Sequence, residues 1–159
     1  MEDKEISKLV KQIENAFADT PYPGKNIGDD GEVGRFIGKR WKDVTREDIN
    51  SNDHLSFFTL DALRYYLPAY LIGVLRNPDL RLDIRLALIK FFDPGEDWKS
   101  NKPELLSKIF SEPEKAAIRS FFENYKQLFL LSKDEPFSSV EKKRREALAR
   151  TIEYWQYYG

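Results

Sequence analysis

The sequence of 159 residues contains no cysteine. Disulfide bonds, thiolate metal sites and cysteine nucleophiles are therefore excluded, and a reducing compartment suits the chain. Histidine is almost absent too, because His54 is the only one. An enzyme that used an imidazole as its general base would have to use that residue.

Long apolar runs are also missing. None approaches the roughly 20 residues that an α-helix needs to cross a membrane. The first five residues, Met1–Glu5, have neither the basic start nor the apolar core of a signal peptide. We therefore expect a cytoplasmic protein that has no membrane partner.

Charge of one sign is not in excess either, since the formal net charge is -1. General nucleic-acid binders usually carry a basic excess, so we expect no nucleic-acid partner. Apolar residues make up 41% of the chain and charged residues 33%, which is typical of a globular protein. With the length, these values predict a single domain over residues 1–159 whose core needs no metal or disulfide.

Apolar residues recur at helical spacing through most of the chain, which predicts an all-α, compact domain of about six or seven helices. Good N-capping residues, Thr45, Thr59, Ser111 and Ser138, begin four of the helices. The stretch 79–92 also alternates like a strand, and its helical context favours a helix. The predicted helices cover residues 3–17, 45–51, 60–76, 79–92, 103–110, 111–131 and 138–157.

Between the first helix and Trp41 the composition changes, and we expect a long irregular Gly/Asp-rich loop there. Loops of this length in compact domains are often functional. The carboxylates would suit a hard cation, but their spacing does not match an EF-hand, and a solvated acidic turn is the simpler interpretation. Arg35 and Trp41 lie in the same loop and are candidates for contact with a partner. The glycines and acidic residues of the loop are Gly24, Gly28, Gly31, Gly34, Gly38, Asp29, Asp30 and Glu32.

The densest apolar stretch, residues 56–71, predicts a central helix. Thr59 is its expected N-cap, and Pro68 is expected to kink it because proline removes one helical hydrogen bond. Tyr65 and Tyr66 either fill the core or line a binding groove. The core is the simpler interpretation for both rings.

Arg64 stands between apolar neighbours in that central helix. A charge that is buried must be paired. We predict that Arg64 holds the Gly/Asp-rich loop in place through one of its carboxylates, Asp29, Asp30 or Glu32. Its loss should then reduce both stability and the order of the loop.

Two further patterns each have a functional and a structural interpretation. His54 stands just before the central helix, where it is either a general base or an exposed residue at a helix end. No nucleophile motif accompanies it, so we predict no catalytic residues. The basic run Lys142–Arg145 with Arg150 would suit phosphates or an acidic partner, and it also fits the solvated face of an amphipathic helix.

The segment Phe57-Phe58-Thr59-x-Asp61-x-x-Arg64-Tyr65-Tyr66-Leu67-Pro68-Ala69-Tyr70-Leu71 resembles the signature of a family of uncharacterised bacterial proteins, which commonly show a Thr-Pro-Glu-x-Phe-Arg-Tyr-Tyr-Leu-Pro-Ala-Tyr type of segment. The resemblance extends to Ile13-Glu14-x-Ala16-Phe17, Phe36-x-Gly38-x-x-Trp41, Ser111-x-x-Glu114 and Tyr154-Trp155, and so covers most of the chain. Leu60, Asp61 and Leu63 depart mildly from the family pattern. The resemblance implies a helical, intracellular bacterial protein of unknown function and supplies no catalytic residues.

The lack of a recognisable catalytic motif favours a binding function. We expect a small protein-binding module of immunity or accessory type, whose partner is another protein and which has no cofactor or metal site. The alternatives are a small-ligand-binding protein or enzyme that uses the acidic loop, and a helical homodimer with a structural role. The candidates for contact with a partner or ligand are Asp29, Asp30, Glu32, Arg35, Trp41, His54, Arg64, Tyr65 and Tyr66.

Overall fold

The computed structural model of the chain describes residues 3–77, 80, 82–96, 99, 105–129 and 139–158. Its helices are α1 (Asp3–Ala16), α2 (Asp30–Val33), α3 (Arg46–Ser51), α4 (Leu60–Arg76), α5 (Leu82–Phe92), α7 (Leu105–Lys108), α8 (Glu112–Phe129) and α9 (Ser139–Tyr158). Three single 3-10 turns accompany them: η1 (Gly34–Phe36), η2 (Trp41–Asp43) and η3 (Leu55–Phe57). The prediction of an all-α fold is confirmed, and the described residues contain no β-strand.

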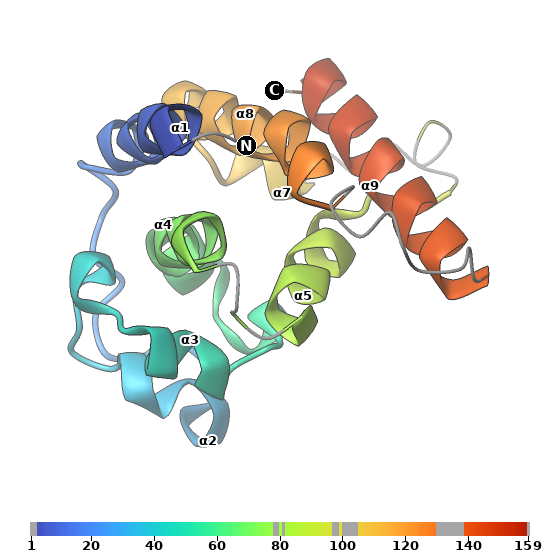
Figure 1. Cartoon of the computed structure of the whole chain (residues 1–159). Helices are drawn as coiled ribbons and strands as arrows, with labels where there is room; N and C mark the ends of the chain where they lie inside the picture. The colour runs from blue at the N-terminus through green and yellow to red at the C-terminus, as the bar shows by residue number, and fades with distance from the viewer. Residues whose placement is uncertain are drawn as a thin grey trace.

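Helix α4 forms the centre of the fold and is seen nearly end-on in Figure 1. Twelve of its seventeen residues are buried. Helices α1 and α3 contact it directly, α8 lies against α1, and α9 lies against both α8 and α5. A helix that is apolar on nearly all sides has to be covered on all of them, and this explains why the other helices surround α4.

Side-chain caps begin three helices where the sequence predicts them. Thr45 and Asp48 form a complete capping box at the start of α3. Thr59 caps α4 through a hydrogen bond of 3.2 Å. Ser111 and Glu114 bond to each other's N–H groups at the start of α8, at 2.8 and 3.4 Å. Each cap satisfies backbone donors that a helix start leaves without a partner.

One stretch that the sequence left open is resolved. The stretch 79–92 contains helix α5, which begins at Leu82, so the helical interpretation was correct. Helix α4 runs through Pro68 without ending there. The predicted cap at Ser138 lies outside the described residues.

The predicted Gly/Asp-rich loop is irregular over residues 20–29 and 37–40, and the short turns α2, η1 and η2 interrupt it. Just before α2, Gly28 pairs with Phe58 in an isolated antiparallel bridge. Gly28 has φ +144°, and a Cβ there would lie 1.9 Å from the carbonyl oxygen of Phe57. Only glycine allows this close approach, which fastens the loop to the start of α4.

The buried apolar side chains form one cluster that joins both halves of the chain. Ile13, Phe17, Tyr66 and Trp155, from three separate segments, are all fully buried in it. None of the described helices combines the length and the apolar composition needed to cross a membrane.

Candidate functional site

Tyrosines of α4 fix the segment that joins α1 to α4, residues 20–58, which we call the anchored segment. The hydroxyl of Tyr65 accepts a hydrogen bond from the N–H of Trp41 at 3.3 Å. The hydroxyl of Tyr70 donates to the carbonyl of Asn52 at 3.0 Å. Tyr65, Tyr70 and Trp41 are all less than 10% exposed, with Trp41 the highest at 7%. These aromatic residues therefore belong to the core.

Tyr66 makes the closest of these contacts. Its hydroxyl lies 2.8 Å from the carbonyl oxygen of Phe36 and 2.7 Å from that of Lys39. Burial raises the pKa of Tyr66 above its ordinary range, and the nearby Tyr22 and Tyr65 add to this effect. The phenol therefore stays protonated and serves two backbone carbonyls of the anchored segment.

A buried carboxylate ties the anchored segment together from within. Asp48 is fully buried and accepts hydrogen bonds from the Nζ of Lys39 at 2.6 Å, the Nε of Arg35 at 3.1 Å and the N–H of Thr45 at 3.0 Å. Burial alone would raise the pKa of Asp48, but these donors outweigh burial and lower the pKa to about 2. Arg35, one of the predicted contact residues, thus has a partner inside the protein.

Arg64 does not hold the Gly/Asp-rich loop, and that prediction was wrong. Its Nε donates to both carboxylate oxygens of Glu114, at 2.8 and 3.2 Å. Glu114 is 1% exposed and also accepts hydrogen bonds from the hydroxyl of Thr20 and the N–H of Ser111. The carboxylate that caps α8 reaches α4 and supplies the charge that a partly buried arginine needs.

The acidic residues of the loop have local roles at a helix start. Asp29 caps α2 by accepting a hydrogen bond from the N–H of Gly31 at 3.0 Å. Asp30 and Glu32 follow in the first turn of α2 and are exposed. Nowhere in the described part of the chain do three or more His, Asp or Glu residues come together so that they could hold a metal ion. The arrangement matches a solvated acidic turn that complements the helix dipole.

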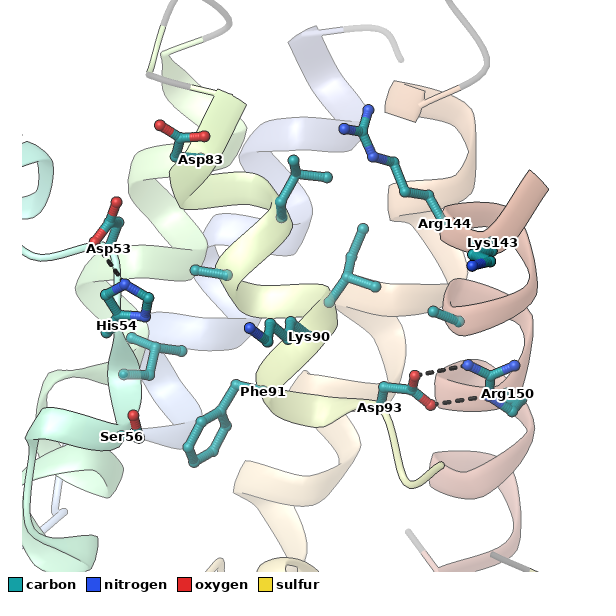
Figure 2. Close-up of a pocket in the computed structure, with 15 residues that line it drawn as sticks. Asp53, His54, Ser56, Asp83, Lys90, Phe91, Asp93, Lys143, Arg144 and Arg150 are labelled. Atoms are coloured by element: carbon teal, nitrogen blue, oxygen red, sulfur yellow. Dashed lines mark hydrogen bonds and ion pairs between the residues drawn. The ribbon is translucent and has the colours of Figure 1, made fainter. Parts of the chain in front are cut away.

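An open cleft of about 900 Å³ lies over α5, between residues 53–56 and α9. Figure 2 shows that its side chains come from these three segments, which are far apart in the sequence. A volume of this order is typical of binding sites. Its apolar lining residues are Leu55, Leu86, Ala87, Ile89, Phe91 and Ala147.

Charged side chains surround this apolar floor, with opposite signs on opposite sides. Asp53 and Asp83 lie on one side, and Lys143 and Arg144 of α9 lie on the other (Figure 2). Lys90 stands on α5 between them. Among the described residues, no carboxylate lies at ion-pair distance from Lys90 or Lys143. Within the described part of the chain, these two lysines of the cleft therefore have no carboxylate partner.

Of the nine predicted contact residues, only His54 lines this cleft. Its Nε2 lies 3.5 Å from a carboxylate oxygen of Asp53, and its side chain is 58% exposed. The ring packs edge-on against Phe57, with centroids 5.4 Å apart. A neutral or protonated imidazole in this place offers a ligand one polar contact at the edge of an apolar floor.

The other cleft residues were not predicted as a site. The basic run that includes Lys143 and Arg144 was the available signal, and it fitted a solvated helix face equally well. Arg150 from the same run closes onto Asp93 with two hydrogen bonds, at 2.8 and 3.0 Å. What the sequence does not encode locally is that α9 lies beside α5, and this neighbourhood creates the cleft.

A family match covers almost the whole chain. The sequence model of a family of unknown function (DUF6714) matches residues 5–158. No curated protein and no solved structure matches the chain. The match thus gives a family without an activity, and the geometry of the site has to carry the functional interpretation.

Proposed function

The chain belongs to the family of unknown function DUF6714, and we propose that it is a protein-binding module that holds a segment of a partner protein in the cleft over α5. The observation that carries the proposal is the cleft itself, with its apolar floor and two lysines that have no carboxylate partner in the described chain. Exposed apolar surface and unneutralised charge are both features that a bound partner covers.

The complementary segment is amphipathic and acidic. Its apolar face covers Leu86, Phe91 and Ala147, and its carboxylates pair with Lys90 and Lys143. This corresponds to the recognition of an amphipathic helix in a groove. The apolar floor supplies most of the affinity, while the charges at the edge accelerate association and select the partner.

The partner class that we favour is a toxin or effector, with this protein as its immunity-type or accessory partner in a bacterial cytoplasm. The support is a small helical domain, 159 residues long, that combines a charged cleft with no recognised catalytic motif. A toxin or secreted-effector gene beside the coding gene is the expected neighbourhood. Its absence throughout the family would contradict the immunity version, and cell fractionation tests the location.

A photo-crosslinking residue tests the cleft directly. Ala147 lines the cleft, whereas Ala149 on the same helix is exposed and does not. With p-benzoylphenylalanine at position 147, the protein should form an adduct with one partner protein in cells of the source organism. The same residue at position 149 should give little adduct. Equal adducts at both positions would contradict the proposal.

Charge reversal gives a second matched pair on α9. Lys143 lines the cleft, and its neighbour Lys142 is exposed outside it. Lys143→Glu should weaken binding of the purified partner about tenfold, and Lys142→Glu less than about twofold. Calorimetric titrations at low and high salt measure both. Equal losses would assign the effect to overall charge and not to the cleft.

Small-ligand binding is a second candidate function, favoured by the pair of His54 and Asp53 in the cleft. A binding groove lined by Tyr65 and Tyr66 was the sequence-based alternative to a core role, but both are buried and neither lines the cleft. A ligand with an anionic group would lie between His54 and Lys90. Native mass spectrometry should then detect a bound small molecule that His54→Ala loses, and an unliganded spectrum of the freshly isolated protein counts against it.

A helical homodimer with a structural role is the remaining alternative. Small-angle scattering of the purified protein measures its mass in solution. A dimer that the cleft-filling variant Ala147→Trp dissociates would make a second copy of the chain the occupant of the cleft. A monomer excludes this alternative.

A further inference from the structure

The anchored segment contains a tight turn at residues 36–39, which we call the Ile37 turn. Ile37 has φ -56° and ψ 126°, and Gly38 has φ +78°. The N–H of Lys39 donates to the carbonyl of Phe36 at 3.0 Å. These are the features of a type II β-turn, in which the third residue has a positive φ and is usually glycine. Ile37 therefore stands at the first corner of the turn.

Both ends of the Ile37 turn are fixed to the core. The hydroxyl of Tyr66 contacts the carbonyls of Phe36 and Lys39, at 2.8 and 2.7 Å. The ring of Phe36 is fully buried and packs edge-on against Phe58, with centroids 5.1 Å apart. The ammonium of Lys39 bonds to the buried Asp48 at 2.6 Å. Since binding does not have to order a turn held in this way, little conformational entropy is lost.

The corner residue Ile37 is 38% exposed, although it is apolar. The buried Asp48 neutralises one charge of the basic stretch around it, residues 35–42. Arg40 and Lys42 are exposed, and within the described chain they have no carboxylate at ion-pair distance. The stretch contains no acidic residue, and its cations are Arg35, Lys39, Arg40 and Lys42.

Tyr22 extends the same surface. It is 48% exposed and packs edge-on against Tyr65, with centroids 5.3 Å apart. The hydroxyl of Tyr65 in turn holds the N–H of Trp41, and the ammonium of Lys42 lies 5.5 Å from the centre of the Trp41 ring. Tyrosine and arginine are enriched at interface hot spots, and this surface carries both Tyr22 and Arg40 beside an exposed apolar residue.

We propose that the Ile37 turn docks into a partner protein, with Ile37 filling an apolar pocket whose rim carries Asp or Glu side chains. The acidic rim follows from charge complementarity, because Arg40 and Lys42 present two exposed positive charges beside one apolar anchor. The surface is separate from the cleft over α5, since none of its residues lines that cleft. The protein would then have two binding surfaces: the Ile37 turn, which inserts into a partner, and the cleft, which holds a segment of one.

The first test places p-benzoylphenylalanine at position 37 of the full-length protein, in cells of the source organism. The matched control carries it at Leu60, an apolar residue of similar exposure, 47%, that is not part of a turn. We expect an adduct at position 37 in a protein region rich in Asp and Glu, with about a tenth of that yield or less at position 60. No adduct, equal yields, an adduct in a region without acidic residues or an adduct with a second copy of this chain would each overturn the proposal.

Affinity for the purified partner tests the two parts of the contact. Ile37→Asp and the double variant Arg40→Glu with Lys42→Glu should each weaken binding about tenfold or more, and the second loss should shrink at high salt. Gly38→Ala leaves Ile37 in place but opposes the positive φ of the turn, so it should also weaken binding.

Thermal unfolding shows whether the variants in these measurements are folded. Ile37 is exposed, so Ile37→Asp should leave the midpoint unchanged, and Ile37→Ser is the milder replacement if it does not. A folded Ile37 variant that binds as tightly as the parent protein overturns the proposal. Ala147→Trp fills the cleft and should leave the adduct at position 37 intact. If that adduct disappears, the turn is not a separate surface. If only the cleft experiments fail, the proposal for the Ile37 turn is unaffected.

Discussion

The two sides of α4 are held together by different interactions. On one side, buried tyrosine hydroxyls and the fully buried Asp48 bind the anchored segment. On the other side, α5 and α9 enclose an open cleft, and the pair of Arg150 and Asp93 that links them is partly exposed, at 22% and 18%. A buried polar group that loses its partner costs free energy, whereas a solvated ion pair contributes little.

This difference makes the anchored segment rigid and the cleft side adaptable, within one small domain. The anchored segment has one favoured arrangement, because several buried donors and acceptors are satisfied only there. The cleft is floored by apolar contacts, which tolerate small displacements of α9 without leaving polar groups unpaired. We infer that the anchored side presents a fixed surface and that the cleft side receives a partner.

The largest effect should come from Gly28→Ala. The new Cβ would lie 1.9 Å from the carbonyl oxygen of Phe57, at φ +144°. Strain and overpacking together should lower the free energy of unfolding by about 4 kcal/mol. Urea denaturation measures this loss. Gly34→Ala is the control, since Gly34 has φ -56° and open space around it, and it should change stability by less than about 1 kcal/mol. Equal losses of stability in the two variants would show that the bridge between Gly28 and Phe58 does not anchor the loop.

The next largest effect is expected for Glu114→Gln. It leaves Arg64 without its charge partner and replaces an oxygen that accepts hydrogen bonds at a 1% exposed position. Breaking such a buried pair should cost about 3 kcal/mol. Glu112→Gln, two residues earlier and with an 80% exposed side chain, should cost less than about 0.5 kcal/mol. Chemical denaturation measures the free energy of unfolding of both variants. Similar losses would show that the buried carboxylate of Glu114 contributes no more than the exposed one of Glu112.

Acid should loosen the anchored side through Asp48. Its pKa falls from 3.8 to about 2 in the folded protein, so the unfolded chain takes up a proton first as the pH drops. The stabilisation is present above about pH 4 and is lost towards pH 2, and it amounts to about 2 kcal/mol. Unfolding free energies measured across this range should fall, and Asp48→Asn should flatten the fall. An unchanged slope in that variant would show that another carboxylate is responsible.

Tyr66→Phe removes a hydroxyl that serves two carbonyls, those of Phe36 and Lys39. The expected loss of stability is about 1.5 kcal/mol. Hydrogen exchange at the N–H of Lys39, which closes the Ile37 turn, should become faster. Tyr22→Phe changes a 48% exposed ring and should leave this exchange rate unchanged. If exchange in Tyr66→Phe stays as slow as in the parent protein, the turn is stable without the Tyr66 hydroxyl.

The smallest effect should come from the cleft side. Asp93→Asn removes the charge of the pair and replaces one of the two oxygens that accept hydrogen bonds from Arg150. Since the pair is partly exposed, the loss should stay below about 1 kcal/mol. Thermal and urea unfolding both measure it. A loss above about 2 kcal/mol would show that α5 and α9 are fixed as firmly as the anchored segment.

The features that the sequence predicted well are local. Thr59 as a cap, the capping pair at Ser111 and the helix that begins at Leu82 all depend on residues within a few positions of one another. Hydrogen-bonding side chains near a helix start and apolar periodicity decide such features without knowledge of the rest of the fold.

The features that the sequence missed depend on distant partners. Arg64 was expected to bind loop carboxylates, but its partner Glu114 lies 50 residues later in the chain. The role of Glu114 as a cap was visible, whereas its contact with α4 required the packing of α8. The cleft was missed for the same reason, because it exists only where α9 lies beside α5.

The contacts of Glu114 also set the order in which this chain can fold during synthesis. Its carboxylate binds Thr20, which precedes it by 94 residues. At ordinary rates of translation, roughly 5 to 20 seconds separate the emergence of these two residues from the ribosome. During the later part of that interval, Arg64 is already outside without the carboxylate that pairs with it. The N-terminal half of the nascent chain therefore cannot complete these two contacts before the start of α8 has been made.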